Sequence, residues 1–195
     1  HHRSKGRVAK LILDLNKLPS FNNCDDIDLD SRMVVAPSID YIEETFNPSK
    51  FDKLSLEPTL EICVKKDSDQ NPKLDIQVQY APYKTDQGWE NVKENYIESI
   101  IKIISKYAPN INECIDHKKL ITPDDIELEY NVSGGHWHHG EIQIDQLFMM
   151  RPIPGASQYK THLDGLFMCG AGTHPGGGLT GISGKNAAKA VLDDF

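Results

Sequence analysis

The stretch that decides the fold is LEICVKKDSDQNPKLDIQVQY, residues 60–80. Apolar and polar residues alternate on both sides of a polar break at residues 67–72, which is rich in the turn formers Asp, Asn and Pro. The apolar positions are Leu60, Ile62 and Val64 before the break and Leu74, Ile76, Val78 and Tyr80 after it. A period of two on both sides of a turn predicts an antiparallel pair of strands with one buried and one solvated face.

The segments around this pair predict a further strand and several helices. Residues 8–15 are expected to form a strand beside the pair. Ser38 can cap a short helix that ends at residues 47–48, and Thr122 followed by Pro123 is typical of a helix start. The longest expected helix, residues 89–107, carries an apolar stripe at three-to-four spacing. Together these elements predict an α+β fold with an antiparallel or mixed sheet.

Charge and hydropathy exclude several classes of partner. The chain has 195 residues, with 21 basic and 29 acidic side chains, and its formal net charge is −8. Duplex nucleic acid and anionic membranes would repel such a chain at long range. No apolar run approaches the roughly 20 residues that cross a bilayer. We therefore expect no nucleic-acid partner and no transmembrane segment.

The cysteines and the acidic run have simple interpretations. Cys24, Cys63, Cys114 and Cys169 lie far apart and form no CxxC pair. This spacing favours free thiols in the cytoplasm or another reducing compartment. The acidic run at residues 24–30 lacks the glycine that a calcium loop requires, so we expect a solvated loop there.

The histidine-rich segment HWHH, residues 136–139, is the obvious candidate for a metal site. On a strand, His136 and His138 would share a face, and Glu141 or Asp145 could add an oxygen ligand. No third ligand follows at a characteristic spacing, so we expect no metal and interpret the segment as a loop at the surface or in a substrate cleft.

The last thirty residues carry the most chemical information. Residues 166–169 are expected to form a short buried strand, residues 170–181 a glycine-rich loop and residues 182–192 a helix. This order aims backbone N–H groups at a phosphate or another electron-rich group. Gly176, Gly178 and Gly181 satisfy GxGxxG, but Gly176 lies seven positions after Cys169, which does not fit a dinucleotide-binding turn. A tightly packed glycine connection is the alternative interpretation.

The tail resembles the carboxy-terminal signature of phytoene-desaturase-like flavoproteins, in particular the pyridine nucleotide-disulphide oxidoreductase domain-containing protein 2 branch. The resemblance rests on GLFMCGAGTHPGGG at residues 165–178 and GKNAA at residues 184–188, preceded by Tyr159 and Thr161. It extends upstream to the segments VQYAPY (78–83), YAPN (107–110), HGE (139–141), DQLF (145–148) and RP (151–152). It covers essentially the whole chain after residue 6.

The resemblance implies an FAD-dependent oxidoreductase related to carotenoid desaturases and amine oxidases, acting on a hydrophobic or amine-type small molecule. Gly172 and Thr173 would approach the pyrophosphate and ribityl chain, and Leu179 and Thr180 would present backbone N–H groups to the pyrimidine edge of the flavin. A helix N-terminus stabilises the negative charge that develops there on hydride arrival. The remaining residues that the resemblance implies in cofactor binding are Gly170, His174, Gly178 and Gly181.

Several roles stay open at this stage. His139 and Tyr159 are candidate catalytic residues that could line the substrate side, but a capping or structural role for His139 is equally compatible. His174 could contact the flavin or fix the loop. Arg151 could pair with an acid at the interface to a missing half of the enzyme.

The expected organisation has three parts. Residues 1–6 are interpreted as a tag or linker remnant, residues 7–150 as part of a substrate-binding domain and residues 151–195 as an FAD-contacting segment. The family's amino-terminal nucleotide-binding half is expected to be missing, so that this chain alone would bind FAD weakly or not at all and would be inactive. A homo-oligomer is possible on this interpretation. The alternative is a non-catalytic oligomerisation or partner-binding module with a vestigial glycine loop.

Overall fold

The computed structural model describes residues 3–24, 29–67 and 70–194. The chain divides into two compact units. Residues 6–135 form the first, here called the sheet unit, and residues 3–5 with 136–194 form the second, the loop unit. The sequence analysis set its functional boundary at residue 151. That division by function stays a prediction, whereas the structural division follows Gly135.

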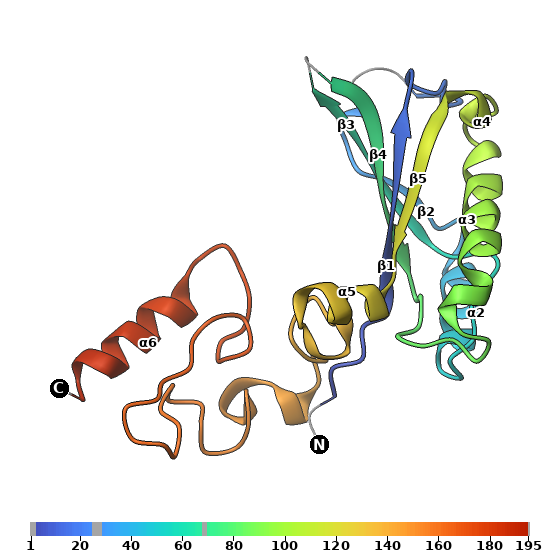
Figure 1. Ribbon diagram of the computed structural model, residues 1–195. Helices are drawn as coiled ribbons and strands as arrows, with labels where there is room; N and C mark the ends of the chain where they lie inside the picture. Colours follow the sequence, from blue (N-terminus) through green and yellow to red (C-terminus); the bar gives the residue numbers. More distant parts are fainter. Residues whose placement is uncertain (1–2, 25–28, 68–69, 195) are drawn as a thin grey trace. The chain divides into compact units, whose positions relative to one another are not determined.

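An antiparallel sheet organises the sheet unit (Figure 1). In the described residues it has five strands in the order β2-β3-β4-β1-β5. Their bounds are Val8–Leu15 (β1), Met33–Val35 (β2), Leu60–Asp67 (β3), Gln70–Gln79 (β4) and Ile115–Ile121 (β5). Ile62 pairs with Ile76 across β3 and β4, which confirms the predicted strand pair. Of the acidic run, residues 25–28 lie outside the described residues.

Three helices cover one face of this sheet: α2 (Ile39–Ser49), α3 (Trp89–Ser105) and α4 (Ile111–Cys114) (Figure 1). The Ser38 hydroxyl accepts a hydrogen bond from the N–H of Tyr41, as expected for the cap of α2. The core lies between sheet and helices. Its largest fully buried side chains include Leu11, Leu13, Leu74, Ile76, Tyr96, Ile100 and Ile104. The apolar alternation of the strands and the stripe on α3 meet there, which is why both form.

The opposite face of the sheet is polar. The ammonium group of Lys10 lies 2.9 Å from a carboxylate oxygen of Asp75, and that of Lys73 lies 3.1 Å from one of Asp14. These ion pairs are partly exposed and contribute little to stability, but they show that this face is solvated, as the alternation predicts.

Helix α5 (Pro123–Tyr130) begins at the predicted cap. The side chains of Thr122 and Asp125 exchange hydrogen bonds with each other's backbone N–H groups, forming a capping box. Burial works against ionisation of Asp125, but hydrogen bonds from Lys93 and Thr122 outweigh it and lower the pKa of the carboxyl group. A 3-10 turn, η1 (Ser133–Gly135), follows at the end of the sheet unit.

The loop unit has little regular structure: two 3-10 turns, η2 (Ile144–Gln146) and η3 (Phe148–Met150), and the helix α6 (Ile182–Leu192). The expected buried strand at residues 166–169 is wrong. Only a single bridge between Lys160 and Phe167 forms, and Leu166 is half exposed. A ladder needs a neighbouring strand, and the described part of the chain places none beside these residues.

No helix in the described ranges combines the length and the apolar character that a membrane crossing requires.

Candidate functional site

The glycine-rich segment at residues 170–181, here called the glycine loop, follows a path that depends on glycine. Gly176 and Gly178 have φ angles of +107° and +156°, a region that L side chains rarely adopt. The loop leads into α6 through Gly181, which acts as the N-cap without a side-chain cap. The predicted order of glycine loop and helix is therefore confirmed, although the strand before it is not.

The loop offers unused hydrogen-bond donors. Within the described residues, the backbone N–H groups at positions 177–180 make no hydrogen bond. The first helical bond of α6 runs from the N–H of Lys185 to the carbonyl oxygen of Gly181, so the N-terminal turn is also open. Leu179 is fully exposed beside these groups. Such an array suits an anionic or electron-rich ligand.

Tyr159 ties the glycine loop to α6. Its side chain is buried, and its hydroxyl donates to the carbonyl oxygen of His174 at 2.6 Å and accepts from Nδ2 of Asn186 at 3.0 Å. Ser183 adds a second tie, because its Oγ donates to the carbonyl oxygen of Gly176 at 3.1 Å. With its hydroxyl engaged in this way, Tyr159 positions the loop, and a catalytic role for it stays a prediction.

Thr173 closes the other side of the loop. It is 2% exposed, and its hydroxyl donates to the carbonyl oxygen of Gly170 at 2.9 Å. The sequence analysis did not single out Ser183 and Asn186. The only signal for Asn186 was its place in GKNAA, and Ser183 gave none, because a hydroxyl near a helix start has many ordinary roles.

Arg151 lies buried against the glycine loop. It is 3% exposed, and one Nη donates to the carbonyl oxygen of His138. Its other Nη would lie 3.8 Å from a Cβ added to Gly176. Nε is buried without a partner, and no carboxylate of the described chain forms an ion pair with the guanidinium. Burial lowers its pKa. A buried cation without a counter-ion is costly, so a negatively charged group would complete this site.

The histidine segment lies beside the same loop. The Cβ of His139 lies 4.0 Å from the position of a Cβ on Gly172. The N–H of His138 donates to Nδ1 of His136 at 3.2 Å. Burial, followed by repulsion from His138, Arg151 and His139, lowers the pKa of His136. No three His, Cys, Asp or Glu residues among those described are arranged to hold a metal ion.

Both catalytic candidates have unusual backbone conformations. His139 and Tyr159 have φ angles of 59° and 69°, the left-handed region that non-glycine residues seldom adopt and that is enriched at functional sites. The two residues thus flank the glycine loop in conformations that the surrounding contacts must hold.

A residue from the range assigned to a tag also belongs to the loop unit. Arg3 forms ion pairs with Asp145 at 2.6 Å and Glu141 at 3.4 Å, and its carbonyl oxygen accepts from Nε2 of Gln146 at 2.9 Å. The HGE and DQLF segments are brought together through these contacts, which no local sequence pattern indicated.

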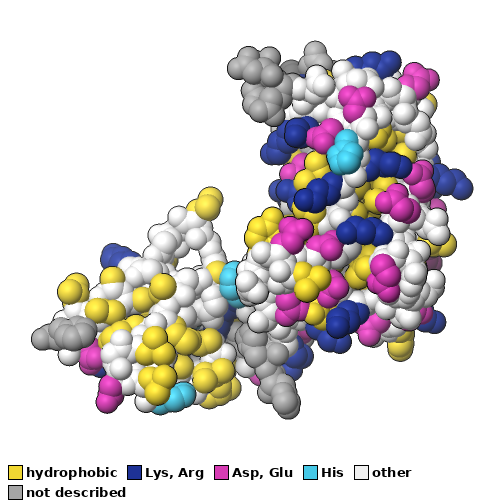
Figure 2. All heavy atoms as spheres, viewed as in Figure 1, with side chains coloured by type: hydrophobic (Ala, Val, Ile, Leu, Met, Phe, Trp, Pro, Cys, Tyr) yellow, Lys and Arg dark blue, Asp and Glu magenta, His cyan; other side chains and the backbone are white. Residues whose placement is uncertain are grey.

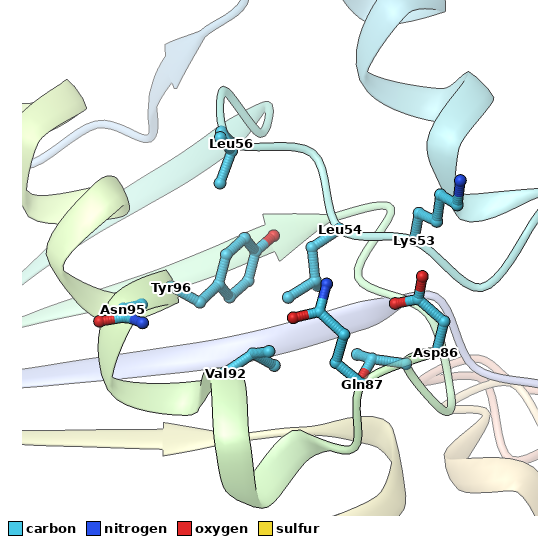
Figure 3. A pocket seen from close by; sticks show the side chains of 9 residues that line it. Lys53, Leu54, Leu56, Asp86, Gln87, Val92, Asn95 and Tyr96 are labelled. Atoms are coloured by element: carbon cyan, nitrogen blue, oxygen red, sulfur yellow. The ribbon is translucent and has the colours of Figure 1, made fainter.

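The sheet unit holds a separate cavity of about 430 Å³ (Figure 3). Its walls are the loop after α2, the loop before α3 and the first turns of α3. The sequence analysis did not anticipate it, because its lining comes from three segments that are distant in sequence.

No family model matches the chain. Individual relatives do. The chain is 33% identical to pyridine nucleotide-disulfide oxidoreductase domain-containing protein 2 of Rattus norvegicus over 165 residues, which covers 79% of this chain and 28% of that protein. It is 33% identical to a limonene dehydrogenase polypeptide of Castellaniella defragrans, over 63% of this chain and 22% of that protein. It is 32% identical to a neurosporene-forming phytoene desaturase of Cereibacter sphaeroides, over 53% of this chain and 19% of that protein.

The chain is homologous to these oxidoreductases. The resemblance that the sequence analysis drew from the tail and the upstream segments is thereby confirmed. The chain spans little more than a quarter of the length of the first of these relatives.

Proposed function

We propose that the loop unit forms one wall of the flavin site of an FAD-dependent oxidoreductase of desaturase or amine-oxidase type. The observation that carries the proposal is the row of unused N–H groups at residues 177–180 next to the buried, acid-free guanidinium of Arg151. FAD carries an anionic pyrophosphate and a pyrimidine edge that becomes negative on reduction, so both features suit it. Homology to oxidoreductases supports the same assignment.

The residues that would hold the cofactor follow from the loop. Gly172 and Thr173 would approach the pyrophosphate and ribityl chain, with Gly170 and His174 completing that side of the loop. The N–H groups of Gly178, Leu179 and Thr180, ahead of the cap at Gly181, would face the pyrimidine edge. When bound, FAD would supply the hydride acceptor for a hydrophobic or amine-type substrate.

The other residues of the unit would act through position and charge. Arg151 would place a positive charge against the loop in surroundings of low polarity, where it acts strongly. Tyr159 would hold the backbone at His174 through its hydroxyl. His139, next to Gly172, is the remaining catalytic candidate.

A complete site would need more than this chain displays. We propose that a nucleotide-binding region outside these 195 residues grips the adenosine part, so that the chain alone binds FAD weakly and does not turn over substrate. The four thiols, none in a disulfide, fit the cytoplasm or another reducing compartment.

A titration of the purified chain with FAD, followed by flavin fluorescence and circular dichroism, tests the proposal. We expect weak, saturable binding that Gly178→Ala reduces about tenfold, because a side chain at that φ displaces the N–H groups. Gly184→Ala is the matched control: it lies in α6 with open space around it and should leave affinity unchanged. Absence of saturable binding by a folded chain, or equal effects of both variants, would contradict the proposal.

A second candidate function has one observation in its favour. Several large apolar side chains of the loop unit are exposed, among them Ile144, Phe148, Met149 and Leu163 (Figure 2). Exposed apolar patches are typical of interaction surfaces. A non-catalytic oligomerisation or partner-binding module would use them without binding flavin, and the same titration separates the two functions.

A further inference from the structure

We propose that the cavity of the sheet unit, here called the α3 pocket, binds a small zwitterionic molecule with an apolar body, such as an apolar amino acid. The pocket lies wholly within the sheet unit, so this proposal does not depend on the flavin site. Its volume of about 430 Å³ falls in the range of small-molecule sites.

The floor of the α3 pocket is apolar. Leu54 comes from the loop after α2, and Val92 and Tyr96 come from neighbouring turns of α3 (Figure 3). Tyr96 is almost completely buried and packs its ring against Trp89, with the centroids 5.9 Å apart. This rigid aromatic and aliphatic surface can bury the apolar body of a ligand.

The rim carries polar side chains that have no partner in the protein. In the part of the chain that the structure describes, no hydrogen bond or ion pair involves the side chains of Lys53, Asp86, Gln87 and Asn95. Gln87 reaches toward Leu54 in Figure 3. The hydroxyl of Thr85 lines the same pocket and is buried without a partner. A buried hydroxyl of this kind is rare unless a ligand or water satisfies it.

The two charges of the rim determine the class of ligand. Lys53 and Asp86 carry opposite charges but form no ion pair with each other. A ligand with both an ammonium and a carboxylate group would neutralise both, whereas a singly charged ligand would leave one unpaired. Because both side chains are exposed, each charge contributes modestly, and selectivity comes from their combination.

The pocket is held open by backbone hydrogen bonds. The N–H of Asp86 donates to the carbonyl oxygen of Asp52 at 3.0 Å, which joins the two loops. The N–H of Lys53 donates to the carbonyl oxygen of Pro48 at 3.1 Å, and the indole N–H of Trp89 to that of Tyr83 at 3.2 Å. A preformed pocket avoids the entropic cost of ordering loops on binding.

The experiment compares three probes by NMR titration of the whole chain: L-phenylalanine, 3-phenylpropionate, which lacks the ammonium group, and phenethylamine, which lacks the carboxylate. We expect saturable shifts of the amides around residues 85–96, with a Kd for L-phenylalanine of about 1 mM and affinities at least ~5-fold weaker for the two other probes. Asp86→Asn should reduce L-phenylalanine to the affinity of 3-phenylpropionate, and Lys53→Met to that of phenethylamine.

The controls are Asp40→Asn and Lys102→Met, which remove the same charges from exposed positions outside the pocket and should leave binding unchanged. Amide spectra of all variants that match outside the pocket show that the fold is kept. No saturable shift with L-phenylalanine, equal binding of all three probes, or insensitivity to both pocket variants would overturn the proposal.

Discussion

The two units of this protein distribute their polar and apolar groups in opposite ways. The sheet unit buries its large apolar side chains between sheet and helices and pairs many of its surface charges, as for Lys10 with Asp75. The loop unit exposes apolar side chains such as Ile144 and buries the charged Arg151. The first arrangement stabilises a fold by itself, whereas the second gains free energy only when something binds.

The largest expected effect tests the self-sufficiency of the sheet unit. Ile76→Ala removes a fully buried side chain of β4 and should lower the free energy of unfolding by about 2–5 kcal/mol. Ile144→Ala, in the loop unit, removes a side chain that is 90% exposed and should change it by less than about 0.5 kcal/mol. Urea denaturation followed by circular dichroism measures both. Similar values for the two variants would mean that the units do not differ in this way.

An intermediate effect concerns the buried charge. Arg151→Met removes the desolvated guanidinium but leaves the carbonyl oxygen of His138 without its donor, so we expect stability to change by no more than about 1 kcal/mol. Affinity for FAD should fall about tenfold, and Arg151→Lys should recover part of it. A loss of stability well above ~1 kcal/mol with unchanged affinity would show instead that Arg151 serves the fold of the loop unit.

The smallest effect separates the units by pH. The pKa of His136 is lowered from 6.5 in the folded chain, so the unfolded chain binds more protons as the pH falls through 6.5, and the loop unit loses stability from there downward. The lowered pKa of Asp125 acts differently: its contribution to the sheet unit is present above its ordinary value of 3.8 and is lost only as the pH falls further.

Hydrogen exchange of assigned amides between about pH 7 and pH 5 should therefore show earlier opening in the loop unit, after correction for the intrinsic rate. His136→Gln should remove this pH dependence. Equal pH dependence in both units, or no change in the variant, would contradict the assignment to His136.

Much of the sheet unit could be predicted from the sequence, because its elements follow local rules. Alternation defined β3 and β4, the apolar stripe defined α3, and the capping box at Thr122 defined the start of α5. The predicted strand at residues 166–169 failed, since an apolar run becomes a strand only where a partner strand lies beside it. The glycine loop was predictable as a loop, but its ties to Asn186 and Ser183 were not.

The sequence by itself determined the secondary structure of the sheet unit, the position of the glycine loop before a helix, and the resemblance to desaturase-like oxidoreductases. Only the tertiary structure decided which polar groups lack partners: the guanidinium of Arg151, the N–H groups of residues 177–180 and the hydroxyl of Thr85. Periodicity is a property of neighbouring residues, whereas burial and hydrogen bonding depend on residues far away in the chain, so the candidate binding sites emerge only after folding.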